Sequence, residues 1–389
     1  MFRIQTLNNI APEGLELFPR ASYEIASSIA NPDIILLRSA DLLNAEIPQS
    51  VCAIVRAGAG VNNIPIAQCS ERGIVVFNTP GANANAVKEI VLSALFLASR
   101  KITDGILWAK TISPHDDDLA AVIEKGKSKF EGPEIKGKTL GIIGLGAIGV
   151  MVANDAASLG MDVIGYDPYI SVDSAWNLSR SVKHAETVEQ VLAKSDYVSI
   201  HVPYSEKTKD MLNAEKIKMM KHGARLLNFA RGGLAKEGDV TSALDTGRLS
   251  LYITDFPTPE LLSHDKVICM PHIGASTPEA EINCAVMAAR AAREFLERGN
   301  ISNSVNYPRC KLDQFSPHRL LVANQNIPNM VGQITSILAA HSINITDLIN
   351  HHLGNYAYNI IDTEQEMSED ILAELKKVPG IVRVRTIDF

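Results

Sequence analysis

The sequence predicts an α/β protein with two doubly wound parallel sheets, followed by a smaller module of βαββαβ order. Three observations predict this fold class. Runs rich in Ile and Val alternate with helical stretches over residues 1–80, which is typical of a parallel sheet buried on both faces. A second series of such strands begins at residue 139. Beyond residue 316 the order changes to strand, helix, two strands, helix and strand, which is ferredoxin-like.

The first series of strands is predicted at four apolar runs, RIQTL, DIILLRS, CAIVRAG and IVVFNTP. Each run ends at Gly, Pro or polar residues, which terminate strands. Residues 83–101 follow as a long helix, because apolar residues recur at helical spacing from Val87 to Ala98. Its nearly continuous apolar face predicts burial between domains, at a subunit contact or within one core.

An apolar strand at Thr139–Ile143 leads directly into a glycine-rich turn and a helix. The turn has the spacing G-x-G-x-x-G, with Gly144, Gly146 and Gly149. The first glycine permits a tight turn, the second lets the backbone approach a pyrophosphate, and the third lets the helix pack closely on its strand. The N–H groups of Ala147 and Ile148 at the helix N-terminus suit bound phosphates. This unit predicts a Rossmann-like domain that binds a dinucleotide.

A carboxylate stands at the expected distance from this turn. The apolar run MDVIGY ends in Asp167, 18 residues after Gly149. A carboxylate there accepts hydrogen bonds from ribose hydroxyls, and no Arg follows in residues 167–171 to hold a 2′-phosphate. The sequence therefore predicts NAD rather than NADP. A purely structural glycine turn is the alternative, but the coincidence of strand, helix and acid disfavours it.

Composition limits the class of function. A chain of 389 residues suffices for two or three domains. Its net charge of −7 disfavours a nucleic acid or an acidic membrane as a general partner. The five cysteines are scattered and lack C-x-x-C pairing, which predicts reduced thiols. We find no signal-peptide pattern and no apolar run of about 18 residues, so we expect a cytoplasmic protein. We expect no metal site.

Three later segments resemble the signature of the D-isomer-specific 2-hydroxyacid dehydrogenases: LLNFARGGL (226–234), ITDFPTPELL (253–262) and MPHIGAS (270–276). The resemblance extends to RAGAGVNNI (56–64) and NTPGANANAVKE (78–89). Within the family, the chain is most similar to members that act on 3-phosphoglycerate and carry a C-terminal ACT domain. The resemblance implies two Rossmann-like domains and a ferredoxin-like ACT domain.

The resemblance implies three catalytic residues, Arg231, Glu260 and His272. Arg231 matches the arginine that holds the substrate carboxylate and keto oxygen, and His272 matches the general acid/base that pairs with Glu260. The chemistry agrees, because histidine exchanges a proton near neutrality and a guanidinium binds a carboxylate bidentately. The chain reads Asp-Phe-Pro-Thr-Pro-Glu where the family reads Asp-Val-Phe-x-x-Glu-Pro. Glu260 is therefore placed by counting 29 residues from Arg231, and a surface acid is the alternative.

The resemblance also implies residues that line the cofactor: Thr79, His201, Pro203, Ala230, Asp255, Gly274 and Ala275. Asp255 matches the acid near the nicotinamide ring. For His201 and Asp255, a structural role at the end of a strand is the alternative.

An anion site is predicted in the first domain. Arg56 begins a loop whose small residues, Ala57, Gly58 and Ala59, let backbone N–H groups approach a carboxylate or phosphate. Arg38 ends the preceding strand, so both arginines would face one crevice and hold a phosphoryl group. A surface position is the alternative for each arginine.

The later strands are predicted at YVSIHVP, ARLLNFA, SLYITDF and VICMPHIG, and a further helix begins at residue 278. The expected domains are a discontinuous substrate-binding domain (1–98 and 278–305), an NAD-binding domain (99–277), a linker (306–316) and an ACT-like module (317–389). Because family members are usually at least dimeric, the resemblance implies a homodimer or homotetramer.

These inferences together imply NAD-dependent oxidation of 3-phospho-D-glycerate to 3-phosphohydroxypyruvate, the first step of phosphorylated L-serine biosynthesis. One alternative is a glyoxylate or hydroxypyruvate reductase, which would need neither the arginine pair nor the ACT domain. A second alternative is a non-catalytic regulator that senses NAD(H), which the intact set of three catalytic residues disfavours.

The resemblance implies an L-serine effector site in the ACT-like module. The first helix there is predicted to begin at Pro328, where N–H groups suit a carboxylate. Asn326 and Asn344 match side-chain positions that hold serine in regulated relatives. The module departs from that pattern with Asn324 in place of a histidine and Asn329 in place of glycine. A module that only dimerises is the alternative.

Overall fold

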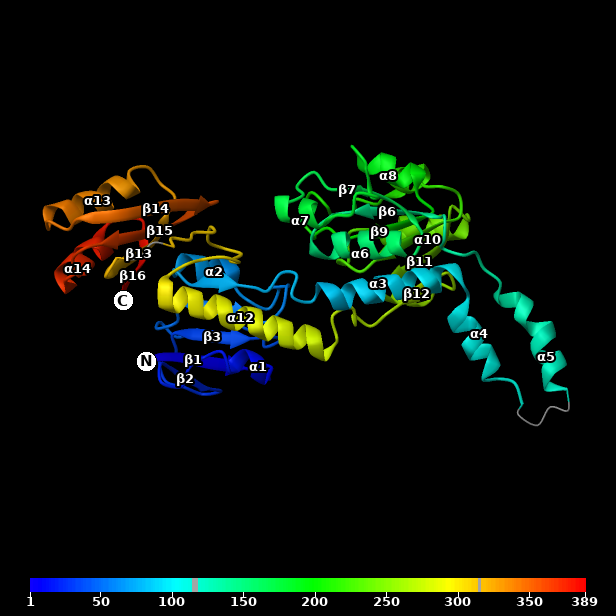
Figure 1. Ribbon diagram of the computed structural model, residues 1–389, viewed down its shortest axis with the longest axis horizontal. Helices are drawn as coiled ribbons and strands as arrows, with labels where there is room; N and C mark the ends of the chain where they lie inside the picture. Colours follow the sequence, from blue (N-terminus) through cyan, green and yellow to red (C-terminus); the bar gives the residue numbers. More distant parts are fainter. Residues whose placement is uncertain (114–117, 314–315) are drawn as a thin grey trace. The chain divides into compact units, whose positions relative to one another are not determined.

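A computed structural model describes residues 1–113, 118–313 and 316–389 (Figure 1). The chain forms two compact units, one of Met1–Asn83 with Pro278–Phe389 and one of Ala84–Thr277. The predicted boundary at residue 98 differs from this division, because the helix after residue 83 packs within the second unit. The predicted linker at 306–316 includes residues 314–315, which lie outside the described residues.

The first unit begins with a five-stranded parallel sheet in the order β2-β1-β3-β4-β5. The strands are β1 (Phe2–Leu7), β2 (Tyr23–Ala26), β3 (Ile34–Leu37), β4 (Ala53–Arg56) and β5 (Val75–Phe77). Four of them were predicted. Strand β2 reads YEIA, and so short a run has no continuous apolar pattern that could have revealed it.

Helices α1 (Pro12–Leu15), α2 (Ile66–Glu71) and α12 (Pro278–Arg298) accompany this sheet. Figure 1 shows α12 lying beside its strands, far from them in sequence. The buried face of α12 consists mainly of alanines, which let the backbones approach closely. A Cβ atom at Gly14 in α1 would lie only 2.6 Å from the Ala285 carbonyl carbon. The chain therefore returns after residue 277 to complete the first core.

The second unit contains a seven-stranded parallel sheet in the order β12-β11-β10-β9-β6-β7-β8. Its strands are β6 (Thr139–Ile143), β7 (Asp162–Tyr166), β8 (Lys183–His184), β9 (Tyr197–Ile200), β10 (Ala224–Asn228), β11 (Leu249–Thr254) and β12 (Val267–Cys269). The order reverses at β6, whose neighbours are β7 and β9. In open α/β sheets, ligands bind at the carboxyl ends of strands at such a switch point.

The helices that accompany this sheet are α3 (Ala84–Ser99), α6 (Ala147–Ser158), α7 (Val172–Asn177), α8 (Val188–Lys194), α9 (Ala214–Met219), α10 (Glu237–Asp245) and α11 (Pro259–Leu262). The long apolar helix α3 lies against α6, and both contribute to one core cluster through residues such as Val91, Leu95 and Val152. The apolar face of α3 was expected to be buried between domains, at a subunit contact or within one core. Its contacts with α6 place it in the core of the second unit.

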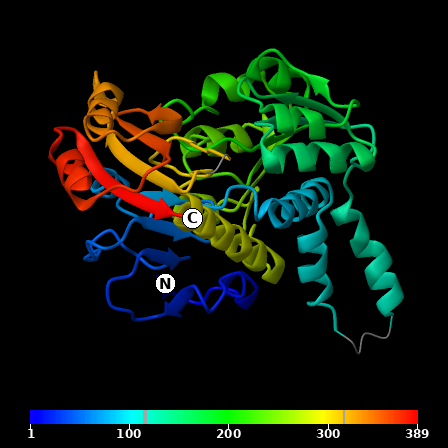
Figure 2. The ribbon, with the colours of Figure 1, turned by 60° about the vertical axis from the view of Figure 1, so that its left-hand side comes forward.

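Helices α4 (Ile102–Ala109) and α5 (Leu119–Gly126) and the 3₁₀ helix η1 (Lys127–Phe130) follow α3. Figure 2 shows α4 and α5 projecting away from the sheet of their unit. Trp108 packs against Phe130 with ring centroids 5.3 Å apart, and this contact joins α4 to η1. Most other apolar side chains of α4 are exposed.

The C-terminal part of the first unit has the predicted βαββαβ order. Its elements are β13 (His318–Gln325), α13 (Met330–Ala340), β14 (Ile345–Leu353), β15 (Tyr356–Thr363), α14 (Glu369–Lys377) and β16 (Ile381–Asp388). The sheet is antiparallel in the order β14-β15-β13-β16. Helices α13 and α14 lie on one face of this sheet (Figure 1), and side chains of that face pack against them. The opposite face joins the core around α12.

The first helix of this module begins at Met330, and the predicted start at Pro328 was wrong. Asn329 has φ +64° and therefore stands in the left-handed region outside the helix. Asparagine tolerates this conformation better than most residues, which explains how it serves at a position where the family has glycine.

A buried ion pair joins β13 to β15 in this module, and its arginine also contacts the end of α12. Arg319 and Asp362 are about 1% exposed, and the guanidinium donates to the carboxylate through Nε at 2.6 Å and Nη2 at 2.9 Å. Arg319 Nη1 also donates to the Arg298 carbonyl at the end of α12 at 2.8 Å. In the described part of the chain, no helix is long and apolar enough to span a bilayer.

Candidate functional site

The glycine-rich turn between β6 and α6 combines tight packing with one open position. Gly144 has φ +96°, and a Cβ atom there would lie 2.7 Å from the His201 carbonyl oxygen. A Cβ at Gly149 would overlap the Gly144 carbonyl, so α6 packs directly on the turn. A Cβ at Gly146 would meet nothing within 4 Å. The backbone is therefore accessible at Gly146, beside N–H groups of the first helical turn that have no acceptor within the helix.

Asp167 is attached to the same turn by backbone hydrogen bonds. Its carboxylate accepts from Leu145 N at 2.8 Å and from Tyr169 N at 2.8 Å. These bonds orient the carboxylate beside the glycines without help from a ligand. A negative charge there disfavours a 2′-phosphate and accepts hydrogen bonds from ribose hydroxyls.

His201 follows β9 and packs behind the turn. Its backbone N donates to Ile143 O at 2.7 Å, and its Nε2 lies 2.9 Å from Ser199 Oγ. Its Nδ1 is buried without a hydrogen-bond partner in the described chain. Burial lowers the pKa of His201 to about 4, because the imidazolium loses its hydration. His201 is therefore neutral at physiological pH and is unsuited to proton exchange there.

Arg231 lies on the turn that follows β10. Its side chain is exposed, and Nη1 donates to the Ala230 carbonyl at 2.7 Å. Buried Asn228 braces this turn, since its Nδ2 donates to the Arg231 carbonyl at 2.9 Å and its Oδ1 accepts from Ala230 N at 3.2 Å. Asn228 was not predicted as a site residue. Its signal in the sequence is its position as a polar residue within the apolar run ARLLNFA, which indicates a buried side chain that needs hydrogen-bond partners.

Asp255 holds the loop that carries His272. The Asp255 side chain is buried, and its carboxylate accepts from Ile273 N at 2.9 Å and from Gly274 N at 2.8 Å. His272 has φ +56°, and its ring packs on Phe256 with centroids 5.0 Å apart. The contacts of Asp255 therefore fit the structural alternative for this residue, because they position the histidine loop.

Glu260 lies on the short helix α11 and is exposed. Its Oε1 accepts from Thr241 Oγ1 at 3.1 Å. A second contact between the same two helices is a hydrogen bond of 2.9 Å from Thr258 Oγ1 to Glu237 Oε2. Among the described residues, no hydrogen bond joins Glu260 to His272. In this conformation α10, rather than the histidine, orients the candidate acid.

The two arginines of the predicted anion site lie at the ends of the neighbouring strands β3 and β4, where Leu37 pairs with Arg56. Arg56 Nε donates to the Arg38 carbonyl at 2.8 Å, and Arg56 Nη1 donates to Gly60 O. The Arg38 side chain extends instead to α12, where its Nη1 lies 2.6 Å from Glu281 Oε1. The structure thus brings the arginines together and adds Glu281, an acid that was not predicted to lie there.

The loop after Arg56 is braced from β5. Thr79 N donates to Gly58 O at 3.1 Å, and Asn78 Nδ2 donates to Ala59 O at 2.7 Å. These bonds hold the loop from Ala57 to Ala59 at the carboxyl edge of the sheet. Thr79, expected to line the cofactor, belongs to this first unit and is fully buried.

The candidate effector residues do not form one cluster within the chain. Asn324 is 1% exposed, and its Oδ1 accepts from the buried Asn359 Nδ2 at 2.7 Å. Asn326 lies beside the β14–β15 turn, since its Nδ2 donates to Gly354 O at 3.2 Å. Asn344 immediately precedes β14 and therefore lies at the other end of this nine-residue strand, roughly 30 Å away at about 3.4 Å per residue.

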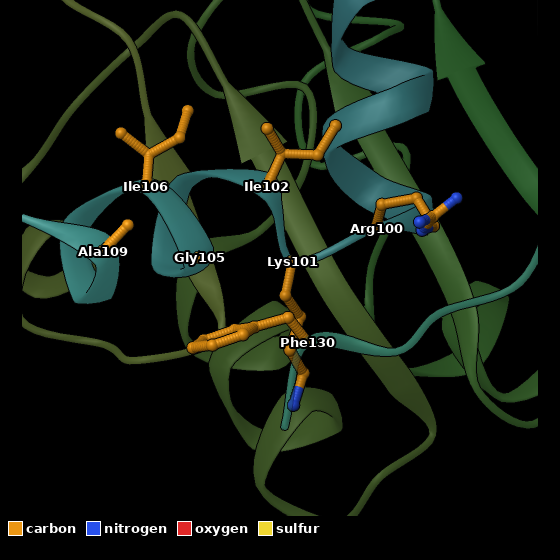
Figure 3. Close-up of a pocket in the computed structure, with 7 residues that line it drawn as sticks. All are labelled: Arg100, Lys101, Ile102, Gly105, Ile106, Ala109 and Phe130. Atoms are coloured by element: carbon orange, nitrogen blue, oxygen red, sulfur yellow. The ribbon is translucent and has the colours of Figure 1, made fainter. Parts of the chain in front are cut away.

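The remaining predicted cofactor residues lie on the loops just described: Pro203 accepts from Thr208 Oγ1 at 2.7 Å, Ala230 precedes Arg231, and Ala275 follows Gly274. A pocket of about 300 Å³ lies elsewhere, between α4 and η1 (Figure 3). Its lining comes from Arg100, Lys101, Ile102, Gly105, Ile106, Ala109 and Phe130. In residues 1–113, 118–313 and 316–389, no group of His, Cys, Asp or Glu could hold a metal ion.

Comparisons with known proteins agree with this arrangement. Residues 105–274 match the family model of the D-isomer specific 2-hydroxyacid dehydrogenase NAD-binding domain. A D-3-phosphoglycerate dehydrogenase of Methanocaldococcus jannaschii is 32% identical over 84% of the chain and 61% of its own length. The Haemophilus influenzae enzyme of the same name is 30% identical over 94% of the chain and 88% of its own length. The chain thus spans less than two thirds of the archaeal relative.

A solved structure supports the same relationship. The NAD⁺-bound 3-phosphoglycerate dehydrogenase of Entamoeba histolytica has a TM-score of 0.60 and 26% identity. The match covers 78% of this chain and 98% of that one.

Proposed function

The chain belongs to the D-3-phosphoglycerate dehydrogenases of the D-isomer specific 2-hydroxyacid dehydrogenase family, and on that premise we propose that it oxidises 3-phospho-D-glycerate to 3-phosphohydroxypyruvate with NAD. The main observation in support of NAD binding is the glycine turn. Its backbone is open at Gly146, and the carboxylate of Asp167 is hydrogen-bonded beside it. The reaction would serve L-serine biosynthesis in the cytoplasm.

The residues of the turn fit the dinucleotide. The open backbone at Gly146 and the N-terminus of α6 would bind the pyrophosphate, and Asp167 would bind the adenosine ribose. NAD supplies the acceptor for the hydride that leaves the substrate carbon. His201, whose imidazole is neutral and whose Nδ1 is buried, would line the cofactor site with a polar but uncharged side chain.

The substrate hydroxyl must lose a proton as it becomes a carbonyl. We propose that His272 accepts this proton and that Arg231 orients the substrate through its carboxylate. Asp255 holds the loop of His272 by two backbone hydrogen bonds, which restricts the orientation of the histidine. Glu260 would leave its bond with Thr241 and stabilise the imidazolium once substrate is bound.

Arg38 and Arg56 would hold the phosphoryl group, aided by the N–H groups of the loop at Ala57, Gly58 and Ala59. The first α/β sheet would then serve as the substrate-binding domain, and the second as the NAD-binding domain. A non-phosphorylated hydroxy acid makes no use of this arginine pair, which favours the phosphorylated substrate.

The test is the formation of NADH, followed by absorbance, with 3-phospho-D-glycerate, D-glycerate and glycolate as alternative substrates. We expect turnover of the phosphorylated acid and a loss of about 10²–10⁴-fold in kcat for His272→Ala. His222→Ala, which removes another histidine of the second unit, is the matched control. Turnover of only the non-phosphorylated acids would replace this proposal with a different dehydrogenase, and NAD binding without any turnover would favour a regulator.

We also propose self-association through the hairpin of α4 and α5, as a homodimer or as part of a homotetramer. Five large apolar side chains are exposed there: Ile102, Ile106, Leu107, Leu119 and Ile123. Leu107→Glu should lower the mass measured by light scattering, whereas Leu43→Glu, at an exposed leucine of the first unit, should not. An unchanged mass in Leu107→Glu would exclude this contact.

The C-terminal module would act as an ACT-like regulatory domain that binds L-serine. The separation of Asn326 from Asn344 means that such a site needs two copies of the module, each contributing one end. L-serine should then release heat in calorimetry only with the associated protein. Absence of both heat and inhibition would leave the module with a structural role.

A further inference from the structure

The ion pair between Arg38 and Glu281 lies at the candidate anion site. Arg38 follows β3, and Glu281 lies in the first turn of α12. Their charged atoms are 2.6 Å apart, and both side chains are more than 40% exposed. Such a pair is accessible to solvent and to a ligand, and it is weak enough to exchange partners.

Arg56 is constrained differently. Its guanidinium donates to the carbonyls of Arg38 and Gly60, which are uncharged. The ion pair with Glu281 is made by Arg38.

Cys284 lies close to the same charged groups. Cys284 is buried one helical turn after Glu281. Burial raises the pKa of its thiol, the charges of Arg38 and Arg56 oppose this shift, and the charge of Glu281 adds to it. Two positive charges and one negative charge thus act on the same small region.

We propose that Glu281 is a positioning residue that competes with the phosphoryl group of the substrate for Arg38. The proposal rests on the proposed function, since it assigns Arg38 to the phosphoryl group. In the substrate-free protein Glu281 holds the guanidinium and balances its charge. A phosphoryl group displaces the carboxylate because it carries more negative charge and a third acceptor oxygen.

Competition within the protein raises the apparent dissociation constant of any anion that needs Arg38. The factor is the inverse of the fraction of Arg38 that is free of Glu281. For the strength of an exposed ion pair, this factor is about two- to sixfold. The consequence is weaker retention of inorganic anions and faster release of the phosphorylated product.

The test uses Glu281→Gln in the full-length protein. We expect KM for 3-phospho-D-glycerate to fall about two- to sixfold, with kcat changed less than twofold and KM for NAD unchanged. The inhibition constant of inorganic phosphate should fall by a similar factor. Glu279→Gln removes an exposed acid from the same helix and should change these constants much less.

A double-mutant cycle separates this role from general electrostatics. In an Arg38→Ala background, Glu281→Gln should no longer lower either constant. An unchanged KM and an unchanged phosphate inhibition constant in Glu281→Gln would overturn the proposal, and so would an equal effect in the presence and absence of Arg38. Glu281→Ala serves as a second variant if Glu281→Gln does not fold.

Calorimetry with inorganic phosphate keeps the inference separate from the proposed function. If the wild-type protein did not oxidise 3-phospho-D-glycerate, the proposed function would fail. Tighter phosphate binding by Glu281→Gln than by the wild type would still support the competition, and equal binding would refute it.

Discussion

Replacing Gly146 by Ala separates the cofactor role of the glycine turn from its structural role. Gly146 has φ −73°, and an added Cβ would meet no atom within 4 Å. The folded protein therefore accommodates the methyl group without strain. Gly146 is the N-cap of α6, where Ala is less favourable than Gly, but the unfolded chain of the variant is less flexible. We expect these effects to leave stability changed by no more than about 1 kcal/mol.

Binding of the dinucleotide should respond far more strongly. The methyl group would occupy the open side of the turn, where we place the pyrophosphate. Loss of one charge-assisted hydrogen bond costs about 1.5–3 kcal/mol, which corresponds to an increase in Kd of roughly ten- to a hundredfold. Titration of NADH fluorescence measures the Kd, and thermal unfolding measures the stability of the same preparations.

Two variants complete this experiment. Gly238→Ala also adds a Cβ into open space, on α10, and should leave the Kd unchanged. Gly144→Ala should instead reduce stability, since φ is +96° and the Cβ would press on His201 O. A normal Kd for Gly146→Ala with a normal melting temperature would refute the assignment of this turn to the pyrophosphate.

Three further predictions follow from the same structure. Asp167→Ala should raise the ratio of kcat/KM with NADP to kcat/KM with NAD. Equal use of both cofactors by the wild type would contradict the role of the carboxylate. Arg319→Met should lower the free energy of unfolding by about 3–5 kcal/mol, because Asp362 stays buried without its partner; Arg319→Met combined with Asp362→Leu should recover much of the loss, as denaturant titration can show. His201 binds its proton less readily when folded, with a pKa of about 4, so stability should fall as the pH decreases from about 6.5 to about 4 by roughly 3 kcal/mol. His201→Asn should flatten this dependence in thermal melts recorded over that range.

Local sequence determined most of the secondary structure and the position of the glycine turn. Strand β6 has the predicted bounds, Thr139–Ile143, because a short apolar run between polar residues and glycine has few other solutions. The spacing of Gly144, Gly146 and Gly149 likewise specified where the backbone turns and where it stays open. The βαββαβ order after residue 316 was also readable, since each element carries its own periodicity.

The hydrogen-bond partners of the candidate residues emerged only with the tertiary structure. Glu260 bonds to Thr241, Arg38 pairs with Glu281, and Arg319 is buried against Asp362. None of these three partners was predicted, because sequence spacing carries no information about which distant surface packs against a charged residue. The left-handed backbone at Asn329, which delays helix α13, is a further example. Periodicity and turn chemistry act over a few residues, whereas the partner of a charge is set by contacts between separate elements, such as α11 with α10 or α12 with the end of β3.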